Sequence, residues 1–139
     1  MNWLTWALLS ACFAAATAIL AKIGVEGVDS NFATAVRTTV VVVFTWLIAF
    51  SLRGPRSFHV PSNRTWLFLG LSGIATGLSW ICYFRALQLG PASRVAPIDK
   101  LSVALVIVSS VLFLGEKLTW GKAVGGVLIV AGAIAVALD

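Results

Sequence analysis

Five apolar stretches, each close to twenty residues long, follow one another along the chain. They cover residues 3–21, 33–52, 66–84, 95–114 and 120–138. A helix needs about 20 mainly apolar residues to cross a bilayer, and none of these stretches shows the period-two alternation of a barrel strand. Short connectors rich in Gly, Pro, Asn and Asp separate them. The pattern predicts an all-α integral membrane protein, with residues 1–139 forming a single domain built as a five-transmembrane-helix bundle.

The composition agrees with a lipid environment. Sixty per cent of the 139 residues are hydrophobic and only 11% are charged, whereas a soluble domain has about 25% charged residues. The net charge of +5 comes from ten basic residues scattered singly among apolar runs. Such scattering is typical of loops that flank membrane spans, so we expect the lipid bilayer as a partner and no nucleic acid.

The basic residues also bear on orientation. Five lie in the second and fourth connectors and at the start of the last stretch, and four lie on the opposite face. Because Lys and Arg collect on the cytoplasmic side, this count favours an N-terminus inside and a C-terminus outside. A margin of one residue is also compatible with insertion in both orientations.

The fourth apolar stretch contains Pro97, Asp99 and Lys100. A charge at membrane depth costs about 2.5–3.5 kcal/mol on insertion scales, so it is retained mainly where it faces a cavity or a partner. A proline in a span frees a backbone group that lipid cannot satisfy. Together the three residues indicate the interior of a small membrane transport protein.

Arg37 and Asp99 are predicted to lie at the same depth. Each is 15 residues from the inner end of its stretch, which places both about 22 Å from the cytoplasmic edge. Their opposite charges predict an ion pair, or one polar cavity shared with Lys100. Asp99 and Lys100 project about 100° apart, so each is expected to need a separate partner. The alternative is that these charges only hold helix ends together or reach the interface.

Two further features shape the expectations. Asp99 is the only acid within an apolar stretch and is therefore the candidate coupling or gating group, while the excess of bases around it suggests an anionic substrate. Gly73 and Gly77, like Gly121 and Gly125, have the spacing of close helix contacts, either within one bundle or with a second chain.

Nothing in the sequence points to catalysis or to a bound cofactor. The single histidine, His59, falls in a connector, and no metal-ligand spacing or Ser/His/Asp set occurs. We therefore expect no enzyme, no cofactor and no metal.

The second half of the chain resembles the EamA domain of the drug/metabolite transporter superfamily. The resemblance rests on Tyr83-Phe84-Arg85-Ala86-Leu87, on Gly90-Pro91-Ala92-Ser93-Arg94-Val95-Ala96-Pro97, on Leu114-Gly115-Glu116-Lys117-Leu118, and on Gly125, Leu128-Ile129 and Gly132. It implies a five-helix half-transporter, multi-pass in a bacterial inner (plasma) membrane. Familiar members fuse two inverted halves into a ten-helix exporter of amino acids or other metabolites, and only one half is present in this sequence.

The resemblance also guides the candidate site. The family pattern near Pro97 marks a helix beside the central cavity, and Glu116 is expected at an inner helix end in a structural role. The candidate substrate-binding or coupling residues are Asp99, Lys100, Arg37, Pro97, Tyr83 and Trp80. The expected function is that of a secondary transporter subunit, and its direction is expected to be export of a small metabolite, amino acid or drug. It would work by alternating access as a dimer with an inverted second copy or paired half-transporter. A non-transporting membrane assembly or lipid-interaction subunit is the alternative.

Overall fold

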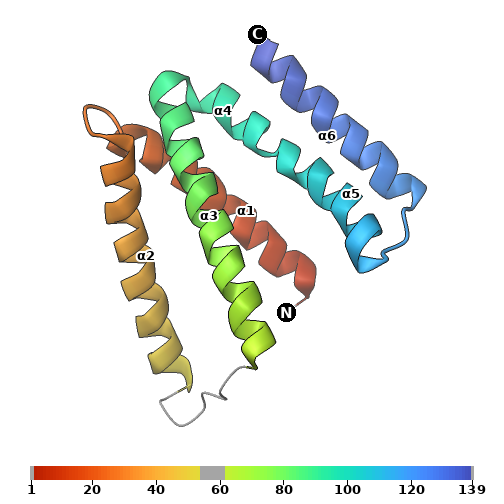
Figure 1. The fold of residues 1–139 in the computed structure, drawn as a ribbon. Helices are drawn as coiled ribbons and strands as arrows, with labels where there is room; N and C mark the ends of the chain where they lie inside the picture. Colours follow the sequence, from red (N-terminus) through yellow and green to blue (C-terminus); the bar gives the residue numbers. More distant parts are fainter. Residues whose placement is uncertain (1, 54–61, 139) are drawn as a thin grey trace. The chain divides into compact units, whose positions relative to one another are not determined.

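The computed structural model describes residues 2–53 and 62–138, of which 88% are helical and none lies in a strand. The helices are α1 (Trp3–Gly24), α2 (Ser30–Arg53), α3 (Asn63–Leu89), α4 (Ala92–Asp99), α5 (Leu101–Leu114) and α6 (Trp120–Leu138), drawn in Figure 1. Five spans are long and apolar enough to cross a membrane, because α4 and α5 together form one span. The prediction of an all-helical, five-span membrane protein is confirmed.

Three helices begin directly after a polar residue that caps their first turn. A side-chain oxygen accepts backbone N–H groups at 3.0 Å for Asp29 before α2, at 3.2 Å for Ser62 before α3 and at 3.4 Å for Thr119 before α6. Such caps satisfy N–H groups that have no partner within the helix. As a result α2 and α3 begin at Ser30 and Asn63, each three residues before its apolar stretch.

The fourth span is interrupted at Lys100. Its backbone N–H is shared between the carbonyl oxygens of Ala96, at 3.3 Å, and Pro97, at 3.1 Å. Pro97 lies one turn earlier and has no N–H of its own, so it weakens the regular ladder of helix hydrogen bonds. The single helix predicted for residues 95–114 is therefore two segments, and the break coincides with the charged residues.

Backbone packing divides the chain into two compact units. In the unit formed by residues 1–22 and 89–139, α6 lies alongside α4 and α5 (Figure 1). There the Lys22 ammonium also donates to the Gly90 carbonyl at 3.2 Å, which ties the end of α1 to the connector before α4. The other unit, Ile23–Gln88, is the hairpin of α2 and α3. The single domain stays a prediction, and the connector at 54–61, with Arg56 and His59, lies outside the described residues.

Close packing occurs at a different glycine from those expected. A Cβ atom placed on Gly73, Gly77, Gly121 or Gly125 would meet no described atom within 4 Å. At Gly126 it would meet Ile107 Cδ1 at 3.4 Å. Of the two alternatives for those four glycines, close contact within the bundle is not seen among the described atoms, and contact with a second chain stays a prediction. On α6 the reason is geometric, because Gly126 lies about 100° around the helix from Gly125 and faces α5.

Candidate functional site

An arginine stacked on aromatic rings lies within the α2–α3 hairpin. The Arg37 guanidinium carbon lies 4.2 Å from the centre of the Trp80 ring and 5.4 Å from that of Phe84. Trp80 and Phe84 are four residues apart on α3 and so share one face. Tyr83 directly precedes Phe84 on the same helix. The ring faces attract the cation, most strongly for Trp, and they hold Arg37 against α3.

Within the unit Ile23–Gln88, no described carboxylate forms an ion pair with Arg37. A guanidinium carries five N–H donors in one plane. A ring that covers the flat face leaves the edges able to donate, and those edges match the two oxygens of a carboxylate or phosphate. Arg37 is therefore held in place by its aromatic neighbours while its hydrogen-bonding capacity remains available.

A groove of about 500 Å³ runs between α2 and α3. It is lined by Asn31, Thr34, Ala35, Thr38, Thr39, Val42, Val43, Gly77 and Ile81. The hydroxyls of Thr34, Thr38 and Thr39 each donate to the carbonyl four residues earlier, at 2.7, 2.8 and 3.0 Å. Because each hydroxyl proton is engaged by the backbone, the oxygens can act only as acceptors. The groove thus offers acceptors to a ligand that carries N–H or O–H groups.

Pro97, Asp99 and Lys100 come together at the break between α4 and α5. The Lys100 ammonium lies 3.3 Å from Asp99 Oδ2, with the two side chains 56% and 37% exposed. The expectation that these neighbours need separate partners is therefore wrong. The long, flexible lysine stem lets the ammonium reach back to the adjacent carboxylate despite the angle between the two side chains.

The predicted pair of Arg37 and Asp99 joins residues of different units and stays a prediction. Arg37 is seven residues after Ser30 and Asp99 is seven after Ala92, the first residues of their spans, and their common depth stays a prediction. The six predicted site residues fall into two groups, which are Arg37, Trp80 and Tyr83 in the hairpin and Pro97, Asp99 and Lys100 at the break.

The sequence reasoning did not count Phe84 or the threonines of α2 among the site residues. Phe84 could have been found from its spacing of four residues from Trp80, because that spacing places both rings on one helix face. Thr34 and Thr38 have the same spacing. Their hydroxyls were not treated as a signal, since a threonine in a helix often bonds back to its own backbone.

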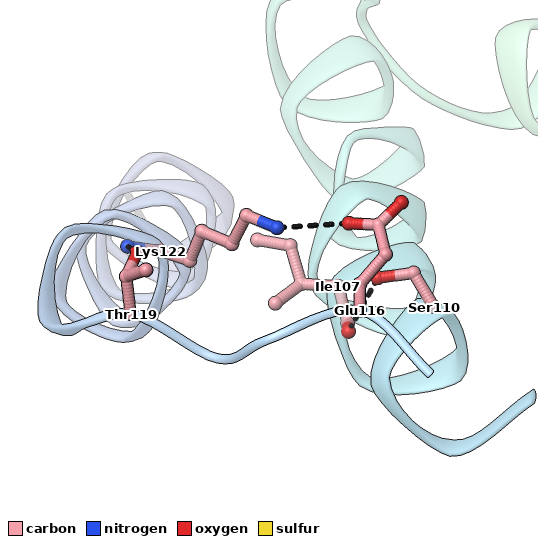
Figure 2. Close-up of polar contacts among 5 residues, drawn as sticks. All are labelled: Ile107, Ser110, Glu116, Thr119 and Lys122. Carbon is pink, nitrogen blue, oxygen red and sulfur yellow. Dashed lines mark hydrogen bonds and ion pairs between the residues drawn. The ribbon is translucent and has the colours of Figure 1, made fainter. Parts of the chain in front are cut away.

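Glu116 lies between α5 and α6 and joins the two helices. Its Oε2 accepts a hydrogen bond of 2.8 Å from the Lys122 ammonium, and its backbone N–H donates to the Ser110 carbonyl at 3.2 Å (Figure 2). The hydrogen bond from Lys122, with the positive charge of that lysine, holds the pKa of Glu116 below its usual value. These contacts support the structural role expected for Glu116.

A second groove, of about 520 Å³, lies between α5 and α6. Its lining is apolar apart from Lys122 and includes Ala104, Ile107, Gly126 and Val130. A bilayer can fill such a surface with acyl chains without the loss of any hydrogen bond.

Five apolar spans and a broken helix that carries charge are typical of a multi-pass membrane transport protein. The EamA-like transporter family model matches residues 1–138. The chain belongs to the EamA-like transporter family, as its sequence resemblance implied.

Two similar proteins carry functional names. "Uncharacterized transporter in cobO 3'region" from Sinorhizobium sp is 51% identical over 138 residues, which cover 99% of this chain and 97% of that protein. "Probable 4-amino-4-deoxy-L-arabinose-phosphoundecaprenol flippase subunit ArnF" from Erwinia tasmaniensis is 43% identical over 68 residues, or 48% of this chain and 52% of that protein. No solved structure gives a significant match.

Proposed function

We propose that this chain is one half of a secondary transporter that exports a small metabolite, amino acid or drug across a bacterial inner membrane. The observation that carries the proposal is the match of the whole chain to a transporter family. The broken span at Pro97–Lys100 adds support, because unwound or interrupted helices at membrane depth surround the binding sites of many transporters.

The working unit is a dimer of inverted halves. With five spans the two ends of the chain lie on opposite sides of the membrane, and two halves related by an axis in the membrane plane must insert in opposite orientations. The flippase relative is named a subunit, which fits a protein that works with a partner. Gly73, Gly77, Gly121 and Gly125, which have open space around them, are suited to close contact with another chain.

Asp99 acts as the coupling or gating group. It lies beside Lys100 at the helix break, and ionisable groups within spans are the usual carriers of coupling protons. Alternating access would change the surroundings of this ion pair as the two halves rock against each other.

A lipid-linked phosphate is a second candidate substrate. It is favoured by the likeness to the flippase subunit, whose name specifies an aminoarabinose joined to phosphoundecaprenol. A scramblase-type assay with a fluorescent phosphoprenol in liposomes would separate it from a water-soluble substrate.

The orientation test uses added lysines. Two lysines in the connector of residues 24–29 bias one orientation, and two in the connector of residues 54–61 bias the other. Each variant is reconstituted alone and together with the other, and uptake of labelled amino acids, sugar phosphates and amphipathic drugs is measured in sealed liposomes. We expect each biased variant alone to be inactive and the mixture to regain transport. Full activity from one variant alone would reject the inverted dimer, and no flux from any sample, wild type included, would reject transport.

A further inference from the structure

We propose that Arg37, held on Trp80 and Phe84, binds an oxyanion group, a carboxylate or phosphate, of the transported solute. The inference rests on the transport function proposed above and names the chemical class of its substrate. It starts from the stacking distances of 4.2 and 5.4 Å that fix the guanidinium against α3.

The N–H donors of the Arg37 guanidinium are not used within its own unit. Among the described residues of the Ile23–Gln88 unit no hydrogen bond or ion pair engages the Arg37 guanidinium, which lies over the Trp80 and Phe84 rings. By contrast Arg85, next to Phe84 on α3, donates to the Gln88 side chain at 2.9 Å. When the flat face of an arginine is stacked and its edges are unused, the guanidinium can donate hydrogen bonds to two oxygens at once.

The positive charge of Arg37 lies within a membrane span. A cation within a membrane span requires a counter-charge or a water-filled cavity. In the same unit Asp29, which directly precedes α2, accepts two backbone N–H bonds as the cap of that helix. An anionic solute would supply the missing charge each time it binds.

The charge of Arg37 also limits the class of solute that the hairpin can bind. The nearby groove of about 500 Å³ is lined by Thr34 and Thr38, whereas Arg37 is not among its lining residues. The oxyanion contact is therefore assigned to the guanidinium alone, and an amino acid or a sugar phosphate carries the group that it would bind. A cationic drug would be repelled by Arg37.

The test measures equilibrium binding to the purified chain in a maltoside detergent without added phospholipid. Acetate and inorganic phosphate are titrated at constant ionic strength against chloride, and tryptophan emission and thermal stability are recorded. We expect at least one oxyanion to give a saturable change in emission and to stabilise the fold, whereas chloride does neither. Arg37→Gln should weaken the apparent affinity at least about tenfold, the size expected for loss of a charge-assisted hydrogen bond.

Three further variants separate binding from structure. Arg37→Lys keeps the charge without the planar fork and should weaken binding by a few-fold, and it carries the test if Arg37→Gln does not fold. Trp80→Phe should remove most of the emission change while thermal stabilisation remains. Arg64→Gln is the matched control, because Arg64 also lies over a ring, that of Phe68 at 5.8 Å, but at the far end of α3, and it should bind like the wild type.

The responses to acetate, to phosphate and to an added phospholipid show which kind of oxyanion Arg37 binds. A response to acetate alone assigns a carboxylate and a response to phosphate alone assigns a phosphate. A response that depends on Arg37 but appears only with phosphatidylglycerol would assign the arginine to lipid headgroups and overturn the proposal. Equal responses in wild type and Arg37→Gln, or no response in the wild type, would also overturn it. Binding without flux in liposomes would instead reject the transport function and leave the oxyanion site in place.

Discussion

Charged side chains have different partners in two parts of the molecule, the hairpin of α2 and α3 and the segment of α4 to α6. In the hairpin, Arg37 and Arg64 rest on aromatic rings. In the described part of the α4–α6 segment, both acids are paired with a lysine, Asp99 with Lys100 and Glu116 with Lys122. A lysine that meets a carboxylate is already neutralised, whereas a stacked arginine keeps its N–H edges for another partner.

The two grooves differ in the same sense. Their volumes are nearly equal, about 500 Å³ in the hairpin and about 520 Å³ between α5 and α6. The lining of both is mainly apolar, but the hairpin groove includes three threonines and an asparagine, whereas Lys122 is the polar residue that lines the other. Size alone therefore does not mark a solute site in this protein. The few polar side chains distinguish the two grooves, because only polar atoms can replace the hydrogen bonds that a solute leaves behind in water.

The largest expected effect comes from Asp99→Asn. The change removes the carboxylate that pairs with Lys100 and with it the candidate coupling group, so transport should fall by about tenfold or more, the equivalent of one charge-assisted hydrogen bond. Folding yield in detergent should fall much less, because the pair is partly exposed. Flux in liposomes and monodispersity on size exclusion check both parts. Unchanged flux would place the function in the hairpin alone.

A pair of glycine variants tests the comparison of the grooves directly. Gly77→Leu adds a side chain in the hairpin groove, where no atom lies within 4 Å of the new Cβ, and should lower transport several-fold with little change in thermal stability. Gly126→Leu meets Ile107 at 3.4 Å and should destabilise the α5–α6 contact by about 1–3 kcal/mol through overpacking.

The two variants serve as controls for each other, since replacing a helical glycine raises helix propensity by about 0.8–1.0 kcal/mol in both. Thermal unfolding and flux are measured on the same preparations. The reverse result, with Gly77→Leu unstable and Gly126→Leu inactive but stable, would assign the solute site to the α5–α6 groove.

The smallest expected effect is the pH dependence of the Glu116–Lys122 contact. Lys122 lowers the pKa of Glu116 in the folded chain, so the contact stabilises the fold above the unfolded pKa of about 4.5 and this contribution is lost as the pH falls through the lower folded value. Both side chains are well exposed, so Glu116→Gln should lower the melting temperature at neutral pH by only about 2 °C or less.

The measurement compares wild type and Glu116→Gln at pH 7 and below pH 4, where the two melting curves should converge. Transport at neutral pH should stay close to that of the wild type, which contrasts with Asp99→Asn. A large loss of transport in Glu116→Gln would give this carboxylate a role in solute binding.

Hydrophobicity along the chain determined the five spans, because a lipid bilayer accepts only long apolar helices with satisfied backbones. The polar caps at Asp29 and Ser62 place the starts of α2 and α3 three residues before the apolar stretches. Trp80, Tyr83 and Arg37 were also selected from the sequence, and the structure brings them together in the hairpin.

The tertiary structure decided which partners these residues take. A lysine stem can curl back to a neighbouring carboxylate, so Lys100 pairs with Asp99 although their side chains start about 100° apart. The face on which two helices touch depends on how the side chains fit around the whole circumference. As a result Gly126, and not Gly125, lies against Ile107 of α5. Phe84 joins Arg37 for the same reason. Hydropathy and spacing are properties of the chain alone, whereas the partner of a charge or of a small residue depends on which helix face comes to lie against it.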